Sequence, residues 1–392
     1  MNREIFIFGG GLAGSEAALQ LANNGIQVVL FDRKPGKRDG AYALAGYAEL
    51  VCNNSLGQFN VQRPLGMLLR ELEENGSLLL QIAERCRIHD HNDFSVDVEW
   101  FSSQVTEMIA CHPLITRVER EITELPRKEN VIIATGPLTH DLLARDIALQ
   151  FGIEDFSFSD ASSPIVDITD VDLSNPNILR VSEDIYSVYL DRESYTTFIE
   201  RLISGEVEVD KHALYADTLI MSQPIEKLAK ENLTALLDSK LHRISGNVVI
   251  TLRRAKAFQD SFIISNCTTQ LRNRWQVFAF SALPGFENIT ANSFTRFGRL
   301  HRNTFFVTPQ KLDHFFAVKG YQNAYIIGQI TGIDGYAAAI ASGLVASKRI
   351  MYGDDLPPFP RSTMIGALAW YVAHGDTGNY MPISPTKYLL QL

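Results

Sequence analysis

Short apolar runs alternate with glycine-rich turns at the start of the chain. Residues 4–8 (EIFIF) and residues 27–31 (QVVLF) are apolar runs with the length of a buried β-strand. Between them, residues 15–25 (SEAALQLANNG) carry small and apolar side chains at the spacing of one helix face and end in glycine. The pattern therefore predicts a strand–helix–strand unit at the N-terminus.

The loop between the first strand and the helix reads GGGLAG and has the spacing GxGxxG. Gly9 permits a tight turn, Gly11 lets a pyrophosphate approach the backbone, and Gly14 permits close packing of helix on strand. The helix N-terminus would face the phosphates, and Asp32, at the end of the second strand, is placed to bind ribose hydroxyls. These features predict a dinucleotide site. Its expected residues are Gly9, Gly10, Gly11, Leu12, Ala13, Gly14 and Asp32.

Two later segments favour FAD over NAD as the dinucleotide. Residues 131–137 (VIIATGP) read as a strand that ends in an ATG turn, and residues 325–330 (YIIGQI) as a late strand that ends in glycine. The late strand runs into a helix rich in small residues. Flavoproteins of the glutathione-reductase type often have both segments, whereas NAD domains usually lack the second. The expected contacts here are Gly136, Gly328, Gln329, Thr331 and Gly332.

The remaining sequence mixes strand, turn and helix patterns, which is typical of an inserted domain that carries the substrate. We therefore expect an α/β fold: a glutathione-reductase-type FAD-binding Rossmann domain with an inserted α+β substrate domain. The predicted FAD-binding domain comprises residues 1–95, 128–145 and 320–392, and the predicted insertion comprises residues 96–127 and 146–319.

Composition narrows the functional classes. The 392 residues are 46% hydrophobic, as in an ordinary globular enzyme, and we find no apolar run of the ~18 residues that span a bilayer. The four cysteines lack CxxC or histidine pairing, so we expect neither a metal site nor a disulfide framework, and we expect a cytoplasmic protein without a signal peptide. The net charge of -9 gives RNA little general attraction.

One cysteine stands apart from the others by its surroundings. In residues 48–57 (AELVCNNSLG), Cys52 ends an apolar run and is followed at once by two asparagines and a serine. A buried structural cysteine usually has apolar neighbours on both sides. The residues alone leave a packing role, a metal ligand, a disulfide half and a nucleophile open.

Long motifs in this sequence resemble the folate- and FAD-dependent tRNA (uracil-5-)-methyltransferases, the TrmFO family, which are relatives of the GidA proteins. The motifs are AELVCNNSLG at 48–57, ATGPLTHDLL at 134–143, FTRFGRLHRNTFF at 294–306 and IIGQITGIDGYAAAIASGL at 326–344. The resemblance implies a two-domain flavoprotein that takes a methylene group from 5,10-methylenetetrahydrofolate. The group would pass to C5 of a T-loop uridine in tRNA and be reduced with electrons from NAD(P)H.

The resemblance also implies roles for particular residues. Uracil C5 is a poor nucleophile until a thiolate adds at C6, and the family motif carries a cysteine beside the flavin at the position of Cys52. The resemblance implies that Cys52 handles the methylene–flavin adduct or serves as a redox or nucleophilic thiol. Asn53 would hydrogen-bond the flavin or the pterin. His301 and Arg302, within HRNTFF, would bind pterin, flavin or phosphate.

Two departures from the family pattern keep other functions open. The family's second catalytic cysteine is matched by Ser222 in MSQPIEKLA, and Cys267 is an extra thiol in SFIISNCTTQL. The first hypothesis is therefore C5 methylation of uridine in tRNA or rRNA, with Cys52, Ser222 or Cys267 as candidate catalytic residues. The second is a diverged flavoprotein: a folate- or NAD(P)H-dependent oxidoreductase, or an enzyme acting on another pyrimidine. A weaker third is a non-catalytic, FAD-stabilised RNA-binding protein.

Overall fold

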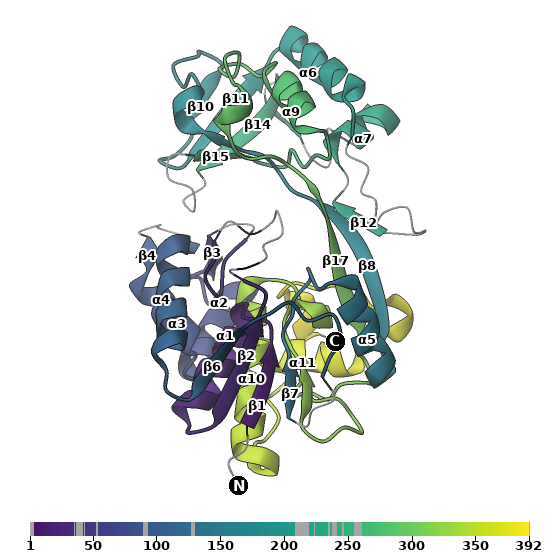
Figure 1. Ribbon diagram of the computed structural model, residues 1–392. Coiled ribbons are helices and arrows are strands. Elements are labelled where there is room, and N and C mark those ends of the chain that lie inside the picture. Colours follow the sequence, from purple (N-terminus) through teal and green to yellow (C-terminus); the bar gives the residue numbers. More distant parts are fainter. Residues whose placement is uncertain are drawn as a thin grey trace. The chain divides into compact units, whose positions relative to one another are not determined.

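The chain forms two compact units, of residues 1–156 with 303–392 (unit 1) and of residues 157–302 (unit 2). Figure 1 shows the elements of both in a computed structural model. The structure describes residues 4–34, 36, 42, 44–51, 54–88, 93–126, 130–207, 219–222, 224–233, 236, 241–244, 247–254 and 261–391.

Unit 1 is built on a parallel sheet of five strands in the order β18-β7-β1-β2-β6. The strands are β1 (Glu4–Phe8), β2 (Gln27–Asp32), β6 (Ile115–Glu119), β7 (Val131–Ile133) and β18 (Ala324–Ile326). The central strands are apolar because they are buried on both faces, as parallel strands usually are. This sheet, with the glycine loop after β1, confirms the predicted Rossmann-type fold.

Helices pack around this sheet. They are α1 (Leu12–Asn23), α2 (Pro64–Glu74), α3 (Leu78–Arg85), α4 (Val98–Cys111), α5 (Asp141–Phe151), α10 (Tyr336–Tyr352) and α11 (Met364–His374). The closest pair is α1 and α10, where a Cβ on Gly343 would lie 2.3 Å from the Ala13 carbonyl oxygen. A small antiparallel sheet in the order β3-β5-β4 completes unit 1, with β3 (Ser55–Gln58), β4 (Arg87–Ile88) and β5 (Asp93–Val96).

The unit boundaries differ from the predicted domain boundaries. Residues 96–127, which the sequence pattern places in the insertion, belong to unit 1. The reason is that β6 pairs in parallel with β2, and α4 packs on α1 and α3. Because β6 is an edge strand in which only Ile115 is buried, its sequence lacks the apolar run of a central strand.

Unit 2 contains an antiparallel sheet in the order β10-β11-β14-β15-β9-β16, with β13 also paired to β14. Its strands are β9 (Ile165–Asp167), β10 (Ile178–Arg180), β11 (Ile185–Leu190), β13 (His242–Ile244), β14 (Asn247–Arg254), β15 (Ser261–Ile264) and β16 (Phe294–Arg296). Its helices α6 (Arg192–Ser204), α7 (Ile225–Glu231) and α9 (Asn273–Phe280) share one hydrophobic core with the sheet.

Two strands carry the chain between the units. The chain leaves unit 1 within β8 (Glu154–Ala161) and returns within β17 (Leu300–Val307), and these pair with β12 (Leu219–Ser222) in the order β12-β8-β17. Short 3-10 helices lie at Ile168–Asp170, Ala291–Ser293, Gln329–Thr331, Gly353–Asp355, Thr377–Asn379 and Lys387–Leu390. Over the ranges that the structure describes, no helix combines the length and apolar character needed to cross a membrane.

Candidate cofactor site

The glycine loop after β1 is packed tightly on one side and open on the other. A Cβ on Gly9 would lie 2.3 Å from the Ala134 carbonyl oxygen, and one on Gly14 would lie 1.9 Å from the Gly9 carbonyl oxygen. Among the residues that the structure describes, no atom lies within 4 Å of a Cβ on Gly11. Gly11 is also the N-cap of α1 and offers no side chain to the amides of the first turn. Open space in front of these amides suits a bound pyrophosphate.

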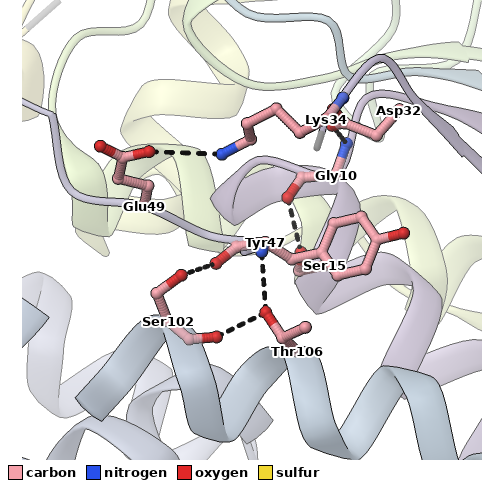
Figure 2. Close-up of polar contacts among 8 residues, drawn as sticks. All are labelled: Gly10, Ser15, Asp32, Lys34, Tyr47, Glu49, Ser102 and Thr106. Atoms are coloured by element: carbon pink, nitrogen blue, oxygen red, sulfur yellow. Dashed lines mark hydrogen bonds and ion pairs between the residues drawn. The ribbon is translucent and has the colours of Figure 1, made fainter. Parts of the chain in front are cut away.

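Asp32 is held beside this loop by two backbone amides. Its Oδ2 accepts a hydrogen bond of 2.7 Å from Gly10 N, and its Oδ1 accepts one of 2.8 Å from Lys34 N (Figure 2). The Tyr47 ring covers Gly10, because a Cβ there would lie 2.3 Å from Tyr47 Cδ1. Burial, and to a lesser extent the charge of Asp32, raises the pKa of Tyr47 to about 12.

The backbone of Tyr47 is fixed by two hydroxyl groups of α4 (Figure 2). Tyr47 N donates to Thr106 Oγ1 at 2.8 Å, and Ser102 Oγ donates to the Tyr47 carbonyl oxygen at 2.7 Å. The next residue, Ala48, has a φ of +52° and donates from its N to the Gly10 carbonyl oxygen at 2.9 Å. This segment is therefore attached to both α4 and the glycine loop.

A buried ion pair extends this attachment toward Cys52. Lys34 Nζ lies 3.4 Å from Glu49 Oε2, and the two side chains are only 6% and 3% exposed. Lys34 Nζ also lies 4.6 Å from the centre of the Tyr42 ring. Glu49 stands three residues before Cys52, so the backbone that leads to this cysteine is anchored at Tyr47, Ala48 and Glu49.

Three glycines that the sequence separates widely come together in unit 1. Gly9, Gly136 and Gly328 follow β1, β7 and β18, which are neighbours in the parallel sheet. Loops at the carboxyl ends of neighbouring parallel strands meet at one edge, where doubly wound folds bind ligands. Gly136 has a φ of +72°, and no atom of the described part of the chain lies within 4 Å of a Cβ placed there.

Side-chain hydrogen bonds hold part of the turn after β18, one of them to α10. Gly328 N donates to Ser342 Oγ at 2.8 Å, and Thr331 Oγ1 donates to the Gly328 carbonyl oxygen at 2.8 Å. Gln329 Nε2 donates to Asp334 Oδ1 at 2.8 Å. The side-chain amide of Gln329 is thus engaged within its own turn.

The remaining predicted site residues are not brought together by the part of the chain described here. Cys52 and Asn53 lie outside the described residues. Ser222 ends β12, where it pairs with Asp160, and His301 and Arg302 lie in β17; the side chains of these three also lie outside the described part.

Cys267 is fully buried in the hydrophobic core of unit 2, which also contains Phe262, Ile264 and Leu271. The structure therefore places its thiol among packing residues rather than at an accessible surface. No group of three or more His, Cys, Asp or Glu side chains within the described ranges could hold a metal ion.

Several residues around the loop have no signal in the sequence. The hydrogen bonds and the ion pair that link these residues join positions at least 15 apart in the sequence. The residues are Tyr47, Glu49, Ser102 and Thr106. Only Lys34 has a local hint, because it follows Asp32 by two residues. A hydroxyl pair one helical turn apart on α4 is too common a pattern to indicate its partner.

Comparison with known proteins shows the family to which the chain belongs. The family described as glucose inhibited division protein A matches residues 4–352. The methylenetetrahydrofolate–tRNA-(uracil-5-)-methyltransferase TrmFO of Aquifex aeolicus (strain VF5) is 33% identical over 406 residues, which cover 100% of this chain and 90% of that protein. TrmFO of Streptococcus sanguinis (strain SK36) is also 33% identical, over 97% of this chain and 90% of that protein.

Solved structures show the same fold at lower sequence identity. GidA of Aquifex aeolicus in its form II crystal superposes with a TM-score of 0.69 at 14% identity, over 99% of this chain and 71% of that chain. The fold, the family match and the relatives at 33% identity agree along nearly the whole length. The chain belongs to the glucose inhibited division protein A family and, within it, groups with the TrmFO enzymes.

Proposed function

We propose that the protein is an FAD- and methylenetetrahydrofolate-dependent enzyme that methylates C5 of uridine in tRNA. The observation that carries this function is the 33% identity to TrmFO enzymes along the whole chain, because those relatives are named for this reaction. The open glycine loop beside Asp32 supports it independently, since the site has the shape that a dinucleotide requires.

FAD would be held at the carboxyl edge of the unit 1 sheet. Its proposed contacts are Gly9, Gly10, Gly11, Leu12, Ala13, Gly14, Asp32, Asn53, Gly136, His301, Arg302, Gly328, Gln329, Thr331 and Gly332. When bound, FAD supplies the transfer of electrons and of the one-carbon unit, with NAD(P)H as the proposed reductant. The amides of the first turn of α1 would bind the phosphates, and Asp32 would orient a ribose.

Cys52 is our proposed thiol for the reaction. Uracil needs a nucleophile at C6 before C5 can attack an electrophile, and a thiolate is far better suited than a serine hydroxyl that lacks an activating base. Cys267 is fully enclosed by the unit 2 core, so it cannot reach a base unless that core opens. Ser222 occupies the other position implied by the family, as a weaker nucleophile.

The RNA partner and the location belong to the same proposal. The relatives are named for tRNA, and rRNA stays a second candidate substrate. A tRNA substrate supports a cytoplasmic location. Ser222, in place of a cysteine, favours one competing function: a flavoprotein of this fold that has lost RNA methylation and acts as an oxidoreductase or on another pyrimidine.

One experiment separates these functions. The purified protein is expected to show a flavin absorption spectrum and to transfer label from methylenetetrahydrofolate to unmodified tRNA in the presence of NAD(P)H. rRNA transcripts, assayed in parallel, decide the RNA substrate. A flavin spectrum without label transfer to either RNA would contradict methylation and favour the competing function.

A further inference from the structure

The C-terminal tail, residues 376–391 after α11, makes specific contacts with the turn at residues 328–335. Tyr380 Oη donates to the Thr331 carbonyl oxygen at 2.6 Å and lies 2.9 Å from Thr308 Oγ1. Burial, as the largest cause, raises the pKa of Tyr380 far above its ordinary value, so its hydroxyl stays protonated at any physiological pH. The tail lies beyond residue 352, where the match to the family ends.

The backbone of the tail continues this contact along the turn. Ile383 N donates to the Gly332 carbonyl oxygen at 2.8 Å, and Asp334 N donates to the Ile383 carbonyl oxygen at 2.8 Å. Ser384 Oγ adds a bond of 2.8 Å to Asp334 Oδ2. Tail and turn thus pair in the manner of two short parallel strands.

The turn needs support from outside because its own backbone is permissive. Gly328, Gly332 and Gly335 have φ values of +81°, +83° and +107°, a region that glycine adopts readily, but fixing a glycine in one conformation costs more conformational entropy than fixing any other residue. A Cβ on Gly332 would lie 2.8 Å from the Tyr380 ring, so the ring also closes the space beside this glycine. Ordering the turn before the ligand arrives lowers the entropic cost of binding.

The tail is in turn fixed to α11. The rings of Tyr371 and Tyr380 stack with centroids 4.9 Å apart, and Tyr371 Oη donates to the Met381 carbonyl oxygen at 2.6 Å. Tyr380 is only 5% exposed, so the contact is part of the unit 1 interior. The contacts with α11 therefore fix the position of the tail beside the turn.

We propose that residues 380–384 form a positioning element of the cofactor site, in which Tyr380 holds the Thr331–Asp334 turn in the shape that binds FAD. This inference rests on the proposed FAD function. Tyr380 acts through the turn and does not itself touch the cofactor.

The test compares Tyr380→Phe with Tyr388→Phe, a change of the same kind on a ring that is 59% exposed. Apoprotein of each is titrated with FAD at a temperature where it stays folded, and backbone hydrogen exchange is measured without FAD. In Tyr380→Phe we expect the FAD dissociation constant to rise about three- to tenfold, as one buried hydrogen bond is lost. We also expect faster exchange at the amides of Ile383 and Asp334. Tyr388→Phe should match the parent in both measurements.

Thr308 provides a second pair of variants should Tyr380→Phe not fold. Thr308→Val removes the hydroxyl that lies 2.9 Å from Tyr380 Oη and 3.4 Å from the Thr331 carbonyl oxygen, and with it the hydrogen bond that orients the Tyr380 hydroxyl toward Thr331. It should shift both measurements in the same direction by a smaller amount, whereas Thr308→Ser keeps the hydroxyl and should match the parent. Unchanged FAD affinity and unchanged exchange in a folded Tyr380→Phe or Thr308→Val protein would overturn the inference. A parent apoprotein that takes up no FAD would instead refute the proposed cofactor, and the exchange data would still decide whether Tyr380 holds the turn.

Discussion

At the scale of single residues, the glycines of GGGLAG have different structural roles although they share one loop. Gly14 brings α1 against β1, because a Cβ there would overlap the Gly9 carbonyl oxygen at 1.9 Å. Gly11 has an ordinary φ of -71°, and an alanine Cβ there would meet no atom of the described residues within 4 Å, so alanine fits without strain. In the proposed function the ligand lies in front of Gly11, whereas the space in front of Gly14 is already filled by protein.

This contrast gives a paired prediction. Gly14→Ala should lower the free energy of unfolding by about 3 kcal/mol, the upper end for an overpacked site. Gly11→Ala should leave the stability of the apoprotein within about 0.5 kcal/mol of the parent and yet abolish FAD binding. Urea unfolding of apoprotein and flavin titration check the pair. Full flavin occupancy in Gly11→Ala would rule out a pyrophosphate at this loop.

At the scale of secondary-structure elements, α4 fixes the segment that leads to Cys52. Thr106→Val should remove the acceptor of the Tyr47 amide, lower stability by about 1–2 kcal/mol and speed hydrogen exchange at Tyr47. Thr106→Ser should restore both, and Ser103→Ala, on the exposed face of α4, should change neither. Equal exchange in the valine and serine variants would show that the hydroxyl does not hold Tyr47.

A second element-scale contact joins α1 to α3 through the buried carboxylate of Glu16. Its Oε2 accepts from Leu79 N at 2.8 Å and from Ser77 Oγ at 3.1 Å, and its Oε1 accepts from Leu78 N at 3.1 Å. Burial is the largest effect on the pKa of Glu16 and raises it, while these hydrogen bonds oppose the rise. The folded protein therefore holds this proton more tightly than the unfolded chain does.

The sign of the pH dependence follows from linkage. Protonated Glu16 contributes its full stabilisation at a pH below 4.5, the ordinary pKa of a glutamate side chain. This stabilisation is lost as the pH rises through the raised pKa of Glu16 in the folded state. Glu16→Gln should destabilise by about 1–3 kcal/mol, because its amide NH₂ would face an N–H donor, and the difference from the parent should narrow as the pH rises above the ordinary glutamate pKa of 4.5. Urea unfolding at several pH values tests this, with Glu73→Gln on the exposed side of α2 as control. A difference that widens with pH would contradict the assignment.

The elements that the sequence predicts well are those with a local pattern. The strand, glycine loop, helix and acid of residues 4–32 each leave a signal within a few positions, so the FAD-binding half can be outlined in advance. The contacts of Tyr47 with α4 and of Tyr380 with Thr331 join residues 49 to 59 positions apart and leave no periodicity. The sequence pattern places residues 96–127 in the insertion for a related reason: β6 pairs with β2, and Ile115 and its partner Val28 lie 87 residues apart.

At the scale of the whole molecule, the candidate nucleophiles are divided between the two units. Cys52 belongs to the residues of unit 1, and Ser222 and Cys267 belong to unit 2. Burial in the core of unit 2 gives Cys267 the ordinary environment of a packing residue. This agrees with our proposal that Cys52, in unit 1, supplies the thiolate that adds to uracil C6.

The prediction for the whole protein is made with tRNA that contains 5-fluorouridine, which traps the covalent adduct at C6. We expect the parent, Ser222→Ala and Cys267→Ala to form the adduct, and Cys52→Ala to form none while it still binds FAD. Cys267→Ala should also lose about 1–2 kcal/mol of stability, because it leaves a small cavity in a packed core. An adduct that survives in Cys52→Ala and disappears in Ser222→Ala would make the serine the nucleophile, and a parent that forms no adduct would favour the flavoprotein that no longer methylates RNA.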